Sequence, residues 1–264
     1  MKYEKELYEA KKAAIIAGKK IMEIYRSGFE VEYKSDNSPV TKADLTANEI
    51  ILSRLKEAFP DYAYLSEETE DNFIRMENDF CFIIDPLDGT KEFVNKTGEF
   101  TVNIALAYKQ EIVVGVIYAP VLDELYYAVR GEGAYKVKDQ VHTKLQVSSR
   151  KDQLIAVESR SHRTEKQNKL MEMYKERISK FVTVGSSLKG CMIASGMIDV
   201  FYRFGEGTKE YDIAAMVLVI EEAGGIIKQL DHTPFMFNKQ DIYNRKGYYI
   251  LNQIDNLFDY SALL

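Results

Sequence analysis

The sequence has only two cysteines, no tryptophan and no apolar run long enough to cross a membrane. Cys81 and Cys191 lie in apolar contexts, so we expect reduced cysteines in the core rather than a disulfide. The first six residues, Met1 to Glu6, carry too much charge for a signal peptide. These features favour a cytoplasmic protein over an integral membrane protein. Peripheral contact with the inner membrane face is kept as an alternative.

Repeats, low-complexity segments and Pro/Gly/Ser-rich linkers are also absent. A chain of 264 residues with 46% hydrophobic content can bury a large core. We expect one compact unit of two lobes: a metal-binding α+β lobe at residues 1–145, and an α/β lobe at 146–264 that adds substrate contacts. The net charge of −6 argues against a nucleic-acid-binding surface. It also makes binding of an anionic substrate difficult unless metal ions reverse the sign of the site.

Helical and strand patterns both occur along the first half of the chain. Apolar residues recur at steps of three and four from Leu7 to Ile24, which predicts an amphipathic helix. Thr41 and Asp44 form a capping-box pattern at the start of a second helix, which ends at Pro60. Farther on, the pattern predicts an antiparallel meander with strands at residues 101–108, 112–118 and 125–129.

The second half alternates between predicted strands and helices. Strands are expected at residues 154–158, 181–184 and 198–203. Helices are expected at residues 164–179, at about 187–196, and from Tyr211 to Gly224-Gly225. A layered α+β architecture follows from this order of elements.

Two carboxylates three residues apart mark the end of a short apolar strand. This strand is predicted at residues 80–84, with Pro86 stopping it and residues 89–90 opening a helix whose free N–H groups favour an anion. Asp85 and Asp88 lie at the strand end, where unpaired carboxylates are costly unless a cation lies beside them.

More carboxylates occur in two other segments, upstream at Glu67 and Glu68 and downstream at Glu210 and Asp212. Together with the aspartates of the strand end, four or five of them can converge on one oxygen-rich site. Carboxylate oxygens are the ligands that Mg²⁺ prefers. The sequence therefore predicts a site that holds hard cations beside a phosphate.

These motifs resemble the signature of the inositol monophosphatase superfamily, a group of lithium-sensitive, magnesium-dependent phosphatases. That signature is a Glu-Glu pair, Asp-Pro-Ile/Leu-Asp-Gly-Thr/Ser and a later Trp-Asp, and the resemblance runs nearly end to end. The runs most similar to the 3'(2'),5'-bisphosphate nucleotidases of the CysQ type are residues 85–93, 98–106, 185–189 and 202–205. One departure is Tyr211, which stands where the superfamily has tryptophan.

The resemblance implies the layered αβαβα sandwich of the sugar-phosphatase fold and two Mg²⁺ ions, with a weakly held third. The ligands implied for the first ion are Glu67, Asp85 and the Leu87 carbonyl. Those implied for the second are Asp85, Asp88 and Asp212, and Asp44 is the candidate outer ligand of the third. By the same resemblance, Thr90 and Glu67 orient the attacking water, and the N–H groups of Gly89 and Thr90 bind the phosphoryl oxygens.

Each metal assignment has a structural alternative. Asp212 and Asp44 lie at helix starts, where carboxylates commonly cap the helix. Glu68 could be the ligand in place of Glu67, because adjacent side chains diverge and the sequence does not choose between them. Thr90 could be only a helix cap.

The resemblance also points to residues that contact the substrate. Ser187, Lys189 and Arg203 are implied to bind the phosphate that is not cleaved, with His162 near the ribose or that phosphate, and Asp212 is also assigned to the substrate. A serine that opens a helix and two cations suit a second phosphate. The alternatives are an N-cap serine, a solvated lysine, an arginine covering a sheet edge and an exposed loop histidine.

We therefore predict a Mg²⁺-dependent phosphomonoesterase that removes the 3'-phosphate of adenosine 3',5'-bisphosphate, and of its sulfated relative, as a clearance step for sulfate assimilation. An inositol or sugar phosphate phosphatase is the alternative on the same scaffold. Phosphatases that form an aspartyl-phosphate space their aspartates two apart, whereas here the spacing is three. A non-catalytic metal or nucleotide sensor is the alternative of another class. The sequence does not determine the oligomeric state, the number of ions or the sensitivity to lithium.

Overall fold

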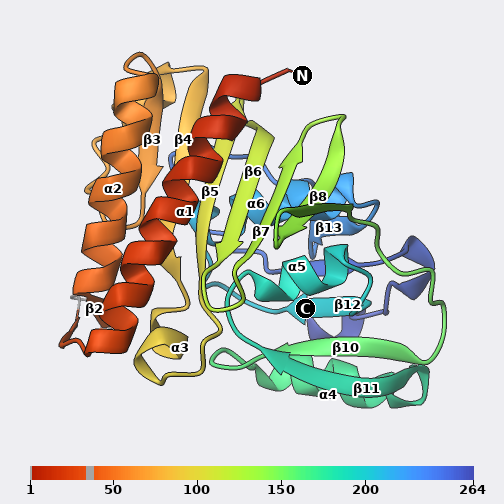
Figure 1. The fold of residues 1–264 in the computed structure, drawn as a ribbon. Coiled ribbons are helices and arrows are strands. Elements are labelled where there is room, and N and C mark those ends of the chain that lie inside the picture. The colour runs from red at the N-terminus through yellow and green to blue at the C-terminus, as the bar shows by residue number, and fades with distance from the viewer. Residues whose placement is uncertain (1, 34–38) are drawn as a thin grey trace.

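Helices and sheets alternate in layers through the molecule (Figure 1). The computed structural model describes residues 2–33 and 39–264. Helices α1 (Glu4–Ser27) and α2 (Lys42–Ala58) cover the outer face of a seven-stranded sheet. Helices α5 (Leu188–Ala194) and α6 (Glu210–Glu222) lie between this sheet and a five-stranded sheet. Helix α4 (Glu165–Met173) covers the far side, which confirms the predicted α+β sandwich.

The seven-stranded sheet follows chain order from one edge to the other. Its strands are β3 (Ala63–Ser66), β4 (Phe80–Asp88), β5 (Thr101–Tyr108), β6 (Glu111–Ala119), β7 (Glu124–Val129), β8 (Gly133–Lys138) and β9 (Val141–Lys144). Only β3 and β4 pair in parallel, and every other neighbouring pair is antiparallel. The predicted meander is confirmed as β5, β6 and β7.

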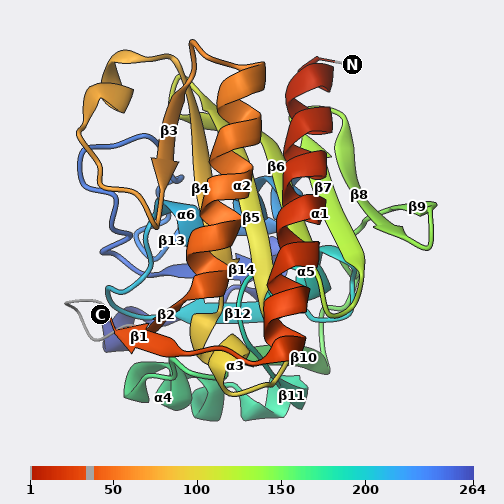
Figure 2. The same ribbon diagram turned by 60° about the vertical axis from the view of Figure 1, so that its left-hand side comes forward.

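The outer helices form where the periodicity predicted them, and they lie side by side across the sheet (Figure 2). In α2 the capping box is present: Thr41 accepts a hydrogen bond from the Ala43 N–H, and its own N–H donates to Asp44 Oδ2 at 2.8 Å. The buried face of α2 includes Ala47 and Ile51, whereas Leu45 is 47% exposed. Two short strands, β1 (Val31–Tyr33) and β2 (Pro39–Thr41), pair beside the start of α2.

The five-stranded sheet has the order β11-β10-β12-β14-β13. Its strands are β10 (Leu154–Ser159), β11 (Ile178–Val184), β12 (Val200–Arg203), β13 (Ile226–Gln229) and β14 (Tyr248–Leu251). One sequence prediction needs correction here, and two strands of this sheet were missed. The helix expected at residues 164–179 ends at Met173, because Ile178 begins β11 and is buried in the sheet. Strands β13 and β14 were not predicted.

Strand β4 is longer than predicted, because Pro86 does not end it. Asp85 pairs with Asn103 and Asp88 with Thr101, and the register shifts between these two pairs. Proline lacks the N–H that a regular ladder needs, and a bulge accommodates this defect. The bulge carries both aspartates to the end of the strand, directly before α3 (Thr90–Val94).

Helix α6 is buried along nearly its whole length, as expected for a helix that is apolar on all sides. It reaches the sheet closely at Gly115 of β6, where an added Cβ would lie 2.7 Å from the Ala215 carbonyl oxygen. The N-terminal end of α6 therefore has a fixed position relative to the ends of β4 and α5.

Other predictions can be compared with the described residues. Cys81 and Cys191 are free and buried, as predicted. No helix in the described part of the chain is long and apolar enough to span a membrane. The division into lobes at residues 145 and 146 stays a prediction, because α5 and α6 from the second half pack against the first sheet.

Candidate active site

A cavity of about 360 Å³ opens where β4, α3, α5 and α6 meet. The predicted site residues that line it are Glu67, Asp85, Leu87, Asp88, Gly89, Thr90, His162, Ser187, Lys189, Arg203 and Asp212. Asp44 and Glu68 are not among the lining residues. The fold thus brings segments from both halves of the chain to one cavity.

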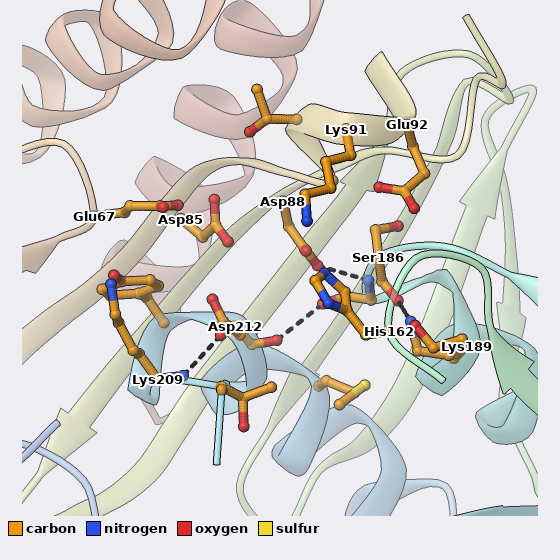
Figure 3. Close-up of a pocket in the computed structure, with 18 of the residues that line it drawn as sticks. Glu67, Asp85, Asp88, Lys91, Glu92, His162, Ser186, Lys189, Lys209 and Asp212 are labelled. Carbon is orange, nitrogen blue, oxygen red and sulfur yellow. Dashed lines mark hydrogen bonds between the residues drawn. The ribbon is translucent and has the colours of Figure 1, made fainter. Parts of the chain in front are cut away.

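The predicted metal ligands and the predicted phosphate-binding cations lie on different sides of the cavity, although Lys209 lies near Asp212 and Glu92 lies on the side of Ser186 (Figure 3). Glu67, Asp85 and Asp212 lie on one side, which we call the acidic side. His162 and Lys189 lie on the other, with Arg203 close enough to influence both; these three define the basic side. Asp88 lies between the two sides (Figure 3).

Asp85 is the most enclosed carboxylate of the acidic side, with 1% of its surface exposed. Its Oδ1 accepts a hydrogen bond from the Leu87 N–H at 3.1 Å, within the bulge of β4. Burial raises the pKa of Asp85 well above its usual value, and the nearby carboxylates of Glu67, Asp88 and Asp212 raise it further. A cation among these groups would offset both effects.

The carboxylates of the acidic side therefore have the chemistry that a hard cation needs, but their side chains are not yet gathered around one point. Among residues 2–33 and 39–264, no three His, Cys, Asp or Glu side chains already gather closely enough to hold an ion. The acidic side instead presents carboxylates from β4, α6 and the segment after β3 around an open space. Oxygen donors of this kind select Mg²⁺, Ca²⁺ or Mn²⁺ over softer metals.

Asp88 is held by donors from both halves of the chain. Its Oδ2 accepts hydrogen bonds from the Ser187 N–H at 2.6 Å, the Ser187 hydroxyl at 2.7 Å and Asn103 Nδ2 at 3.1 Å. Ser187 is 2% exposed, and its hydroxyl also contacts Asn103 and the Asp212 carbonyl. Ser187 therefore lines the cavity and holds Asp88 in place, and its contact with a substrate stays a prediction.

Asp212 combines a helix-start role with a place on the acidic side. Its Oδ2 accepts a hydrogen bond from the Lys209 N–H at 2.7 Å, at the first turn of α6. Burial, then the charges of Glu67 and Asp88, raise its pKa. The neighbouring Tyr211 is 5% exposed in the core between the sheets, so tyrosine fills the packing position where the superfamily has tryptophan.

Thr90 and Asp44 are in contact. The Thr90 hydroxyl donates to Asp44 Oδ1 at 3.0 Å and also lies 3.3 Å from the Leu87 carbonyl oxygen. Asp44 is 1% exposed and uses its other oxygen for the capping box at Thr41. Asp44 thus lies behind Thr90, away from the cavity surface.

The basic side holds cations with few protein partners. Lys189 is buried and donates to the Ser186 carbonyl at 2.5 Å. Arg203 Nε is buried and has no hydrogen-bond partner among the described residues. His162 lines the cavity with an exposed side chain, and partial burial, followed by the charges of Arg203, Lys91 and Lys189, lowers its pKa to about 4. This side is therefore prepared for an anion.

Sequence reasoning missed several residues that the structure places in or beside the cavity: Lys91, Glu92, Ser186, Lys209 and Asn103. Lys91, Glu92 and Asn103 lie within the motifs that carry the family resemblance, yet no role was assigned to them. Lys209 immediately precedes the segment that contains Asp212. The one signal in the sequence that could have identified these residues is that they lie next to the motif residues along the chain.

The chain is similar to several known proteins. Residues 3–254 match the model of the inositol monophosphatase family. Over 226 residues the chain is 39% identical to the 3'(2'),5'-bisphosphate nucleotidase CysQ of Salmonella typhimurium, covering 83% of this chain and 90% of that protein. CysQ from Bacteroides thetaiotaomicron, a bacterial member of the inositol monophosphatase family, has a crystal structure with a TM-score of 0.82, 36% identity and coverage of 96% and 99%. An IMPase from Thermotoga maritima has a TM-score of 0.76, 25% identity and coverage of 91% and 89%.

Proposed function

Because the chain belongs to the inositol monophosphatase family, we propose that it is a Mg²⁺-dependent phosphomonoesterase that removes the 3'-phosphate of adenosine 3',5'-bisphosphate. The sulfated relative of this nucleotide is a second substrate in the proposal. The CysQ relative that shares 39% of its sequence carries the name of this activity. A clearance role in sulfate assimilation, in the cytoplasm, belongs to the same proposal.

The observation that carries the proposal is the separation of charge within one cavity. A phosphate that is to be cleaved needs cations, and the acidic side can hold them. A phosphate that is only bound needs fixed positive groups, and Lys189 and Arg203 supply them on the basic side. A monophosphate would use one side only, so the arrangement favours a substrate with two phosphates over inositol 1-phosphate.

In this proposal Glu67, Asp85 and the Leu87 carbonyl would hold one Mg²⁺, and Asp85, Asp88 and Asp212 would hold the other. Glu67 is preferred to Glu68 because it lines the cavity. When bound, the ions would neutralise phosphate charge, lower the pKa of a water molecule and stabilise the departing ester oxygen. Asp44 is kept as an outer ligand for a third ion.

The chain's own groups orient the reacting atoms. Because the Thr90 hydroxyl donates its proton to Asp44, its oxygen is free to accept a hydrogen bond from a water in the cavity. Glu67, across the acidic side, is the second acceptor for that water. The N–H groups of Gly89 and Thr90 begin α3 and are proposed to bind the phosphoryl oxygens.

Phosphate release in the presence of Mg²⁺ tests the proposal, with adenosine 3',5'-bisphosphate, inositol 1-phosphate and fructose 1,6-bisphosphate compared. Lys189→Ala or Arg203→Ala should raise KM for the nucleotide roughly tenfold, the scale of losing a charge-assisted hydrogen bond. Activity on inositol 1-phosphate should hardly change. Lys180→Ala, on β11 and outside the cavity, is the control. A wild-type preference for inositol 1-phosphate would refute the nucleotidase assignment.

A further inference from the structure

Two glutamates of the first half of the chain, Glu92 and Glu99, have no role in the proposed chemistry. Glu92 lies in α3, and Glu99 lies in the segment between α3 and β5. Both belong to the first half of the chain, yet their carboxylates bind groups of the second half. Two segments of the basic side are therefore attached to the first half at these points.

Glu99 makes the stronger attachment. Its two oxygens accept hydrogen bonds from Arg160 Nε and Arg160 Nη2, each at 2.6 Å, in a bidentate pair. One of these oxygens, Oε2, also accepts the Gly185 N–H at 2.8 Å. Burial raises the pKa of Glu99, but the bonds from Arg160 and Gly185 more than compensate and lower it overall. Glu99 therefore stays ionised and binds both segments at once.

Glu92 makes a second attachment close by, on the same side of the cavity as Ser186 and Lys189 (Figure 3). Its Oε1 accepts a hydrogen bond from the Ser161 hydroxyl at 2.6 Å, and its side chain is 6% exposed. The side chain passes over Gly185, where an added Cβ would lie 2.6 Å from Glu92 Cγ. Glycine at this position thus leaves room for the carboxylate to reach Ser161.

The segments that the two glutamates hold carry His162 and Lys189, two of the three groups of the basic side, whereas Arg203 lies on β12. Arg160 and Ser161 come directly before His162, which lines the cavity. Gly185 comes directly before Ser186, whose carbonyl accepts the Lys189 ammonium. The carboxylates lie close enough to Lys189 to oppose the effect of burial on its charge. Position and charge on the basic side therefore both depend on residues from the first half.

We propose that Glu92 and Glu99 are positioning residues that set the second-phosphate side of the cavity at a fixed distance from the metal-binding side. A bisphosphate must span both sides, so its affinity depends on this distance, whereas a monophosphate at the acidic side is insensitive to it. The identity of the substrate rests on the proposed function. The attachment itself rests on the contacts above.

Hydrogen–deuterium exchange tests the attachment without any substrate. In Glu99→Ala, the Gly185 amide should exchange faster than in wild type because it loses its acceptor. The amides of residues 159–163 should also exchange faster, because the Arg160 side chain is no longer held. Glu99→Gln keeps an oxygen for the Gly185 N–H and should restore much of the protection. Unchanged exchange in Glu99→Ala would overturn the proposal.

Kinetics test the consequence. Ser161→Ala and Glu99→Ala should raise KM for adenosine 3',5'-bisphosphate by roughly two- to tenfold, the range expected for a lost hydrogen bond, with kcat nearly unchanged. KM for inositol 1-phosphate should stay as in wild type. Equal increases on both substrates, or no increase on the bisphosphate, would contradict the positioning role.

Arg130→Ala is the matched control. Arg130 pairs with Glu221 at 2.6 Å, and its side chain is 38% exposed compared with 40% for Arg160. Because that pair lies outside the cavity, its loss should change neither the exchange of residues 159–163 nor either KM. If wild type prefers inositol 1-phosphate, the proposed function fails. The exchange experiment still decides whether the glutamates hold the two segments.

Discussion

Asp85 has surroundings that no other carboxylate of the cavity shares, since it is almost fully buried and the pKa of its carboxyl is raised by four further carboxylates. Its folded-state pKa is raised, so its ionised form costs stability, and this cost grows as the pH rises towards and through that pKa. A side chain of the same shape without charge removes the cost. The same change removes the group proposed to bridge two ions.

Asp85→Asn should therefore reduce phosphate release to below about a tenth of wild type while leaving the metal-free protein at least as stable at pH 7. Saturating Mg²⁺ should raise the Tm of wild type by roughly 5–10 °C, the effect of about 2.7 kcal/mol of binding free energy. It should raise the Tm of the variant much less. Phosphate assays and thermal melts with and without EDTA measure both. Activity above about a tenth of wild type would refute the bridging role.

Single residues could be predicted where their chemistry is tied to a motif. Asp85 and Asp88 were placed correctly at the cavity because unpaired carboxylates at a strand end are costly without a cation, and Asp212 because its segment resembles the family signature. Ser187 was assigned to the substrate, and the structure adds a second role, because its hydroxyl binds Asp88. Sequence cannot distinguish these two roles, because the partner lies 99 positions away along the chain.

At the scale of elements, the position of α6 depends on close contact with β6. The Cβ of an alanine at position 115 would meet the backbone of Ala215 at 2.7 Å, and backbone cannot rotate away. At position 190 of α5 the nearest atoms belong instead to the Met216 side chain, which is flexible. Gly115 therefore tests a contact with the rigid backbone of α6, and Gly190 tests a contact with an α6 side chain that can move.

Gly115→Ala should destabilise the protein by about 1–3 kcal/mol, the usual cost of overpacking, and should lower activity because α6 carries Asp212. Gly190→Ala should cost less, since alanine favours the helix and Met216 can adopt another rotamer. Urea unfolding and phosphate release measure the two effects. An equal or larger cost at Gly190 would show that the contact with β6 does not fix the helix.

Elements with long, regular patterns could be predicted from sequence, whereas several short ones could not. In helix α1 and the meander the apolar residues follow one period over many positions, so a few residues that break the pattern do not change the prediction. Strands β13 and β14 have four residues each and are separated by a long irregular segment, which leaves little periodic signal. The helix predicted at residues 164–179 was too long because the polar residues after Met173 favour helices as well.

At the scale of the whole molecule, the contact between the two halves includes ionised groups beside the cavity. The pKa of Glu99 lies below its ordinary value of 4.5 in the folded protein. A group with a lowered folded-state pKa stabilises the protein above the pKa of its unfolded state, and this contribution is lost as the pH falls through the folded value. Acid should therefore weaken this contact.

Glu99→Gln should be less stable than wild type by about 1 kcal/mol or less at pH 7, because the pair with Arg160 is partly exposed. The difference should shrink as the pH falls below about 4.5 and should vanish once Glu99 is protonated. Urea unfolding at a series of pH values checks this. A difference that stays constant across the series would show that the charge of Glu99 is not involved.

The position of α6 between the sheets also determines what the growing chain exposes during its synthesis on the ribosome. The ribosome completes the seven-stranded sheet at Lys144, but the helix that covers its inner face ends only at Glu222. Until then Ile83, Ala105 and Ile117, which pack against α6 in the finished protein, have no cover from it. At usual rates of synthesis the delay is roughly 5–15 seconds. During that time the nascent chain presents an open apolar face to chaperones and to other chains.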